Sequence, residues 1–132
     1  MAANNETGVI QPIEQIGSLV KEINKARQIK SEQTDTEYIP LFYHIDAAQI
    51  IGKGVSCNPG IVDVQAWQAH YVTIVGHKFY APRSGALYIK SGIPITSWLH
   101  GGGQESGRRS GTENVIDAVG LGAASYEKFQ KK

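Results

Sequence analysis

A lysine directly follows the most strand-like stretch of this sequence. The run Tyr71–Val75 consists of aromatic and β-branched residues, which favour a buried strand, and Gly76, His77 and Lys78 come next. Open α/β sheets bind their ligands at the carboxyl ends of their strands. Desolvation there lowers the pKa of a lysine, and the uncharged amine attacks carbonyl groups. Lys78 is therefore a candidate for Schiff-base chemistry. The alternative is a lysine at the rim of the sheet with its amine in water.

An aspartate occupies the same kind of position earlier in the chain. Residues 40–45, PLFYHI, predict a second buried strand in which His44 is packed, and Asp46 ends that strand. If the two strands are neighbours, an acid and an amine converge at one edge of the sheet. Opposite unit charges about 4 Å apart attract by about 4 kcal/mol at an effective dielectric constant of about 20. The alternative role of Asp46 is to cap the AAQII segment that follows it.

Two loops carry further polar side chains. The first, AANNETGVIQP, has turn chemistry, and on composition alone its asparagines are ordinary turn residues. The second, residues 99–114, combines glycines with Arg108 and Arg109, whose guanidinium groups bind anions. A flexible surface loop with solvated arginines is the alternative. A G-x-G-x-x-G nucleotide site is excluded because no strand immediately precedes these glycines.

The apolar pattern between these residues predicts an α/β fold. Apolar residues recur at helical spacing from Pro12 until about Lys30, and again from Glu113 onward. Residues 52–60 are a loop, residues 61–70 a short helical connection, and residues 86–90 a further strand. This alternation is typical of a mostly parallel sheet flanked by helices. The residues predicted to face the core are Ile13, Ile16, Leu19, Val20, Ile23, Val62, Val64, Trp67, Val115, Val119, Leu121 and Tyr126.

Composition bounds the class of protein. A chain of 132 residues with 41% apolar residues can bury one core, which indicates one domain. A formal charge of +1 with dispersed acids and bases argues against partners such as nucleic acid or an anionic membrane. No apolar run approaches the roughly 20 residues that span a bilayer. The single cysteine, Cys57, excludes an internal disulfide and suits a reducing compartment, so we expect a protein of the cytosol. We expect no metal site.

Four blocks, in this order, resemble the pyridoxal-phosphate enzymes of the cysteine desulfurase and selenocysteine lyase family. They are NNETG at residues 4–8, HIDAAQ at 44–49, TIVGHKFYAPRSGALYI at 73–89 and GGGQESGRRSGTEN at 101–114. The sequences FYAPR at residues 79–83 and GTEN at residues 111–114 resemble the selenocysteine lyases more than the desulfurases. The resemblance implies part of the large domain of an aspartate-aminotransferase-like fold. In that family an upstream segment precedes this region and a C-terminal small domain follows it, so residues 1–132 are expected to be a partial cofactor-binding domain.

The same resemblance implies roles for the residues at the strand ends. Lys78 is the catalytic lysine that holds the pyridoxal phosphate, and His77 binds the phosphate of the cofactor. Asp46 keeps the pyridine nitrogen protonated, which makes the ring a better electron sink. Gln49 is the hydrogen-bond partner of the phenolic oxygen of the cofactor.

The two loops receive roles at the substrate and at a partner subunit. Asn5 faces both the cofactor and the substrate carboxylate, and Arg109 matches the arginine that binds substrate. Thr112 reaches the cofactor phosphate of the other protomer in a homodimer. The implied reaction converts L-selenocysteine to L-alanine and delivers selenium to an acceptor protein. The alternatives are a cysteine desulfurase, which takes sulfur from L-cysteine, and an inactive fragment with a structural or dimerisation role.

The sequence also departs from the family in two places. Val75 stands where many desulfurases have a serine that binds the phosphate, and valine cannot donate a hydrogen bond. Residues 52–60 are longer than the matching loop of the family, and Cys57 lies in this insertion. The catalytic cysteine of the family lies further towards the carboxyl terminus, so Cys57 is interpreted as an incidental thiol.

Overall fold

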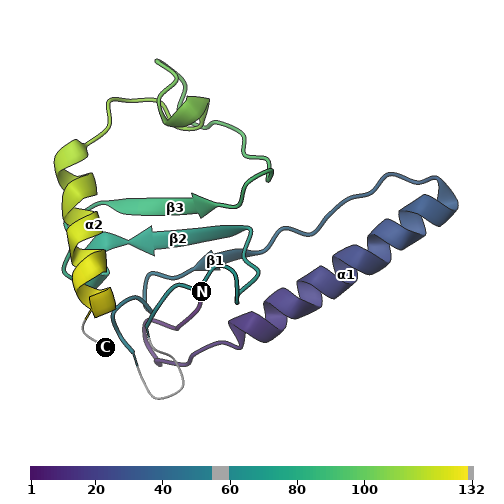
Figure 1. Ribbon diagram of the computed structural model, residues 1–132, viewed down its shortest axis with the longest axis horizontal. Helices are drawn as coiled ribbons and strands as arrows, with labels where there is room; N and C mark the ends of the chain where they lie inside the picture. Colours follow the sequence, from purple (N-terminus) through teal and green to yellow (C-terminus); the bar gives the residue numbers. More distant parts are fainter. Residues whose placement is uncertain (55–59, 131–132) are drawn as a thin grey trace.

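A computed structural model describes residues 1–54 and 60–130, and Cys57 lies outside the described residues. The described residues form two long helices, a small sheet and two short 3₁₀ turns (Figure 1). In chain order the elements are α1 (Ile13–Thr34), β1 (His44–Asp46), β2 (Tyr71–Val75), η1 (Gly76–Phe79), β3 (Gly85–Ile89), η2 (Glu105–Gly107) and α2 (Val115–Gln130).

The sheet has three strands in the order β1-β2-β3. Strand β1 runs parallel to β2, with His44 opposite Tyr71 and Asp46 opposite Thr73. Strand β3 returns antiparallel to β2. The predicted α/β class is confirmed, and the sheet is mixed, with one parallel and one antiparallel pair. The parallel pair matters for the site because it brings the carboxyl ends of β1 and β2 to the same edge.

One face of the sheet carries the core. Ile45 and Val72 are opposite each other on β1 and β2, and both side chains are fully buried. Because side chains alternate along a strand, His44 and Thr73 point to the other face. The core face is completed by residues from α1, the turns and η1. These are Ala2, Ile13, Ala47, Ile50, Ile51, Trp67, Ala69 and Phe79.

Helix α1 begins after Pro12, as predicted, but the predicted end near Lys30 is wrong. The helix continues to Thr34 and ends at Asp35, which adopts a left-handed conformation with φ 50°. Residues 31–34 contain neither glycine nor proline, and the Thr34 hydroxyl donates to the carbonyl oxygen of Lys30 at 2.8 Å. A solvated helical turn needs no apolar periodicity, so the pattern could not reveal it. Only the first half of α1 packs against the core, and the rest extends away from the sheet (Figure 1).

The predicted helical connection over residues 61–70 is a series of turns. The Asp63 carboxylate accepts hydrogen bonds from the backbone N–H groups of Gln65 and Ala66 at 3.0 and 2.9 Å. Gln68 then adopts a left-handed conformation with φ 51°, which an α-helix does not accommodate. Trp67 is buried as predicted, while Val62 and Val64 are half-buried at the edge of the core.

The strand predicted at residues 40–45 is shorter and lies later in the chain than expected. The backbone ahead of β1 is held in part by side chains. Asn24 of α1 donates to the carbonyl oxygen of Leu41 and accepts from its N–H, at 2.9 and 2.7 Å. The Tyr43 N–H donates to Nδ1 of His70 at 2.8 Å. Backbone bonds to the start of β2 begin at Tyr43, whose carbonyl oxygen accepts from the N–H groups of His70 and Tyr71 at 2.9 and 3.1 Å.

Helix α2 leaves most of its apolar residues exposed. Leu121 packs against the core cluster as predicted. Val115, Val119 and Tyr126, which the pattern also turned inward, are exposed, and so is Ile116. The helix is amphipathic, but its apolar side faces outward.

No helix within residues 1–54 and 60–130 has the length and apolar character that crossing a membrane requires.

Candidate functional site

The carboxyl end of β2 leads without a linker into η1, which carries His77 and Lys78. Phe79 is almost fully buried and anchors this turn in the core, whereas His77 and Lys78 are exposed. Tyr80 closes the turn in a left-handed conformation, and its N–H donates to the carbonyl oxygen of Gly76. Lys78 is thus held at a fixed strand end, and it is exposed, as the alternative of a lysine at the rim of the sheet predicted.

Gly76 is the residue that permits this sharp exit from the strand. A Cβ atom added here would lie 2.7 Å from the carbonyl oxygen of Pro82 and 2.8 Å from that of Ser84. The Gly76 N–H donates to the same Ser84 oxygen at 2.8 Å. The segment after η1 therefore packs directly on the backbone before Lys78.

Asp46 ends β1 with one carboxylate oxygen engaged. Oδ1 accepts from the N–H of Ala48 at 2.9 Å, so the aspartate caps the turn that follows, as its alternative role predicted. This turn is not continued as a helix. Oδ2 has no hydrogen-bond partner among the described residues. The half-buried carboxylate therefore retains a free acceptor for a ligand.

The parallel pairing of β1 with β2 places Asp46 and the Lys78 turn at the same edge of the sheet. The N–H of Ala47 donates to the carbonyl oxygen of Thr73 at 3.0 Å, which fixes the two strand ends together. Neighbouring strands with a shared edge are what the sequence predicted for these two residues.

The open face of the sheet carries a polar pair that the sequence did not single out. Nε2 of His44 and Oγ1 of Thr73 lie 2.8 Å apart, and the His44 ring meets the Tyr71 ring edge to face. His44 lies in a strand as predicted, but it is exposed rather than packed. The sequence could have indicated that His44 lies on the same face as Asp46, because residues two apart on a strand point to the same side of the sheet.

Gln49 lies in the turn after Asp46 and keeps its amide nitrogen free. Its Oε1 accepts from Nζ of Lys53 at 2.6 Å. Its Nε2 has no partner within the described part of the chain. The amide can therefore donate a hydrogen bond to an oxygen of a ligand.

The NNETG turn is joined to the Asp46 strand end. The Ala2 N–H donates to the carbonyl oxygen of Asp46 at 2.7 Å. Asn4 organises the turn, since its Oδ1 accepts from the N–H groups of Glu6 and Thr7, both at 2.9 Å. Asn5 is exposed and takes no part in these bonds. Asn4 is thus a structural residue of the turn, whereas the side chain of Asn5 is available to a ligand.

The glycine-rich loop lies beyond β3, on the far side of the sheet from β1 (Figure 1). The Ser110 side chain holds it together by accepting from the Gly103 N–H at 3.2 Å. Arg109 donates to the carbonyl oxygen of Ser110 at 3.1 Å, and Thr112 is exposed. Within one chain, the fold brings neither Arg109 nor Thr112 to Asp46.

Comparison with known proteins shows which family this chain belongs to. The sequence model of the class-V aminotransferase family matches residues 1–127. This chain belongs to the class-V aminotransferase family. Human selenocysteine lyase is 42% identical to this class-V chain over 128 residues, which cover 95% of the chain and 26% of the relative. The cysteine desulfurase IscS of Clostridium botulinum is 42% identical over 125 residues, covering 94% and 26%.

A solved structure supports the fold of this class-V chain. A NifS-like protein superposes with a TM-score of 0.80 at 38% identity, covering 99% of this chain and 31% of the other. The chain therefore spans about a quarter of the length of the curated relatives it matches, and it corresponds to part of the fold of a pyridoxal-phosphate enzyme.

The strand-end residues fit the cofactor of the class-V family, which is pyridoxal phosphate. The site offers a primary amine, a free carboxylate oxygen, a free amide donor and an imidazole. These groups belong to Lys78, Asp46, Gln49 and His77. They complement an aldehyde, a basic ring nitrogen, a phenolic oxygen and a phosphate.

Proposed function

We propose that this chain carries the cofactor-binding part of a pyridoxal-phosphate enzyme that converts L-selenocysteine to L-alanine and releases selenium to an acceptor protein. The observation that supports this most is the parallel pairing that places Asp46 and the Lys78 turn at one edge. We propose that residues 1–132 are part of the large domain of that enzyme, which works in the cytosol.

The residues of the chain have distinct roles in this proposal. Bound pyridoxal phosphate supplies an electron sink for the negative charge that develops at the α carbon of the substrate. The Lys78 amine anchors the cofactor and then moves the proton at that carbon. Asp46 Oδ2 holds a proton on the ring nitrogen, and its unengaged state in this structure suits that role.

Other side chains hold and orient the ligands. Gln49 donates its free amide N–H to the phenolic oxygen, and His77 binds the phosphate. Asn5 binds the substrate carboxylate by hydrogen bonding, and Arg109 binds the substrate carboxylate of a partner subunit by charge. Thr112 serves the cofactor phosphate of a partner subunit, which agrees with its place beyond β3.

The choice of selenocysteine over cysteine as the substrate rests on the two short sequences FYAPR and GTEN. Human selenocysteine lyase and Clostridium botulinum IscS share the same 42% identity with this chain, so overall similarity favours neither substrate. Cysteine desulfuration is the second candidate for that reason. That reaction would use the same residues, and it would release sulfur where the lyase reaction releases selenium.

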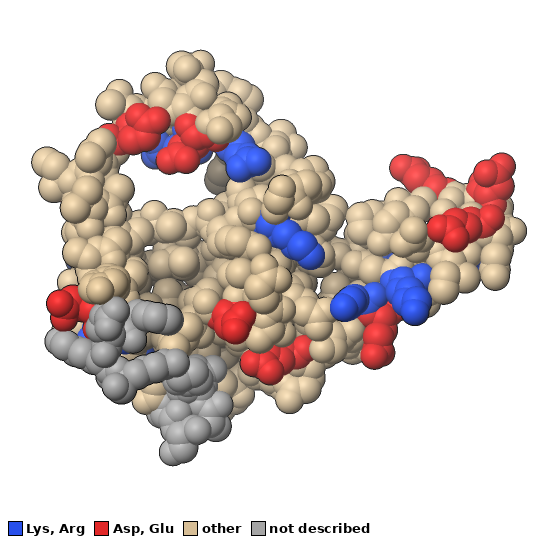
Figure 2. All heavy atoms as spheres, viewed as in Figure 1, with Lys and Arg blue, Asp and Glu red and all other residues tan. Residues whose placement is uncertain are grey.

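A homodimer is the proposed assembly. Ile116 of α2 is 83% exposed and Trp98 is 94% exposed, and burying such side chains is favourable. Figure 2 shows an opening bounded by α2, the sheet and the arch formed by residues 91–114. A second subunit that covers these apolar residues would also receive Thr112.

Alanine release separates the candidate reactions. The chain is mixed with pyridoxal phosphate, and alanine is measured with L-selenocysteine and, separately, with L-cysteine. The proposal predicts alanine from selenocysteine at least about tenfold faster than from cysteine, and none with Lys78→Ala. Lys25→Ala, which changes an exposed lysine of α1, is the matched control and is expected to retain activity.

Two outcomes would decide against the proposal. Comparable turnover of cysteine would make the desulfurase the better assignment. No turnover, together with no visible absorbance band on adding the cofactor, would leave a fragment that acts only in structure or dimerisation.

A further inference from the structure

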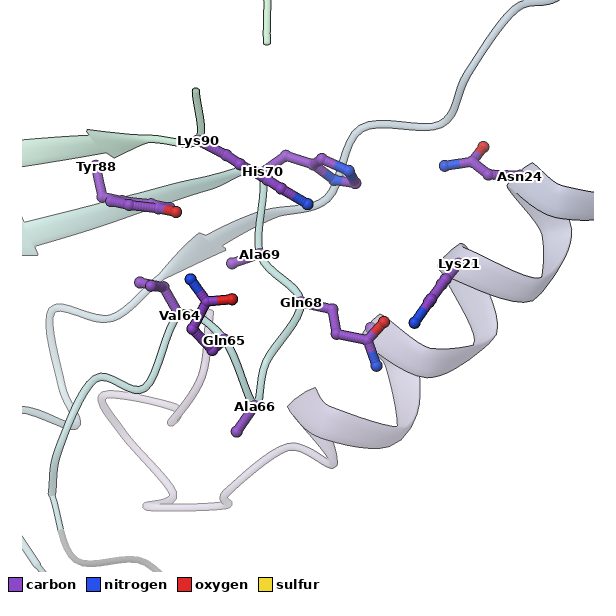
Figure 3. A pocket seen from close by; sticks show the side chains of 11 residues that line it. Lys21, Asn24, Val64, Gln65, Ala66, Gln68, Ala69, His70, Tyr88 and Lys90 are labelled. Carbon is purple, nitrogen blue, oxygen red and sulfur yellow. The ribbon is translucent and has the colours of Figure 1, made fainter. Parts of the chain in front are cut away.

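A second concave site lies at the opposite edge of the sheet from Lys78. It is a cavity of about 490 Å³ between α1, the turns before β2 and the end of β3. His70 directly precedes β2 and Lys90 directly follows β3, so the cavity is at the amino end of β2 (Figure 3). Its volume lies within the range of small-molecule sites. Nothing in the proposed reaction uses it.

The charges around this cavity have one sign. Lys21 reaches it from α1 and Lys90 from the sheet (Figure 3). No aspartate or glutamate lines it, and within the described residues neither lysine forms an ion pair. Two ammonium groups that share a concavity without a counter-charge attract an anion.

Amide and imidazole donors add to the two lysines. The Gln65 side chain lines the cavity and has no hydrogen-bond partner in the described part of the chain. Nδ1 of His70 accepts from the Tyr43 N–H, so the neutral ring carries its proton on Nε2, which is left to donate. Burial and, to a smaller extent, the charge of Lys90 lower the pKa of His70.

The walls are held by close packing. A Cβ atom on Gly17 would lie 2.1 Å from the carbonyl oxygen of Trp67, so α1 rests directly on the turn that forms the floor. Nε2 of Gln68 donates to Oγ of Ser18 at 3.1 Å and joins the same two walls. Gln68 adopts its left-handed conformation at this junction. Such strain persists only where the surroundings enforce it.

We propose that this cavity binds a phosphate dianion, free or as a phosphomonoester, between Lys21 and Lys90, with Gln65 and His70 as hydrogen-bond donors. Two cations facing one cavity favour a doubly charged ligand over a single charge. The apolar wall formed by Val64 and Tyr88 leaves room for the organic part of a monoester.

Amide NMR of the whole chain tests this site. Spectra are recorded while inorganic phosphate or glycerol phosphate is added, with sodium chloride at matched ionic strength as the reference. We expect saturable shifts at Gly17–Lys21 and Gln65–His70 with phosphate and none with chloride. Tighter binding of glycerol phosphate would assign a monoester, and equal or weaker binding would assign the free anion.

Substitution of the lysines tests the charges. Lys21→Met and Lys90→Met are each expected to weaken binding about tenfold, and Arg at either position to restore it. Lys25→Met on the same helix, outside the cavity, is the matched control. The proposal is overturned by equal shifts with chloride, by the absence of shifts around the cavity, or by unchanged binding in both Met variants. Shifts confined to His77 would instead report the cofactor site.

Discussion

At the scale of single residues, Gly76 determines where Lys78 stands. Its missing side chain lets the Pro82 and Ser84 carbonyl oxygens approach the strand end, as described above. Gly76→Ala places a methyl group against backbone that cannot rotate away. We expect the unfolding free energy to fall by about 1–3 kcal/mol and cofactor binding to weaken, because η1 is displaced. Urea denaturation and cofactor titration measure these effects. Unchanged stability would show that the turn is not tightly packed.

His70 makes stability depend on pH. Its pKa is lowered from the ordinary value of 6.5, first by burial and then by Lys90. The unfolded chain therefore binds a proton more readily, so this contribution is fully present above 6.5 and is lost as pH falls through the lower folded pKa. Protonation of Nδ1 also removes the bond from the Tyr43 N–H. Burial raises the pKa of Tyr43, so its phenol does not titrate here.

The matched variant for this prediction is His70→Asn. Asn Oδ1 can accept from the Tyr43 N–H in place of Nδ1 but does not titrate. Urea denaturation between about pH 7.5 and about pH 5.5 is expected to show a steeper loss of stability for the original chain than for the variant. Equal slopes would rule out His70 as the titrating group.

At the scale of elements, the contact between α1 and the turn at Trp67 is fixed by Gly17. Gly17→Ala is expected to cost about 1–3 kcal/mol, because its Cβ would overlap a backbone oxygen. Gly122→Ala is the control, since nothing lies within 4 Å of its added Cβ and it is inside α2. Alanine there is expected to stabilise by about 0.5–1 kcal/mol. Opposite signs in urea denaturation support the packing, and equal signs contradict it.

The elements also show what the apolar pattern can and cannot reveal. Strand β2 was predicted with its observed bounds because five consecutive β-forming residues fit no other element. The end of α1 was missed because it is solvated, and the turns at residues 61–70 because Asp63 and Gln68 override a helical spacing. Ahead of β1, the side chains of Asn24 and His70 bind the backbone at Leu41 and Tyr43. Such side-chain bonds have no periodic signal.

At the scale of the whole molecule, pattern reasoning gave the wrong side of α2 because amphipathicity does not say which surface covers the apolar side. The candidate site divides in a similar way. Asp46 and Lys78 were paired by strand order, which local sequence predicts. Arg109 and Thr112 lie apart from them, and their roles depend on a second subunit.

That assembly predicts the effect of a charge on α2. Ile116→Glu should weaken self-association at least tenfold in sedimentation velocity, because it places a carboxylate in the proposed contact. Ile39→Glu changes another exposed isoleucine away from α2 and should leave association unchanged. A chain that is monomeric at all concentrations, or an equal effect of both variants, would contradict the proposed contact.

The most direct measurement asks which amine takes the cofactor. The chain is incubated with pyridoxal phosphate, reduced with borohydride and digested, and the modified peptides are identified by mass spectrometry. The account predicts that the cofactor is attached to Lys78, and that Asp46→Ala lowers this labelling by at least about tenfold. Labelling spread evenly over the exposed lysines, or labelling of Lys78 that does not depend on Asp46, would contradict it.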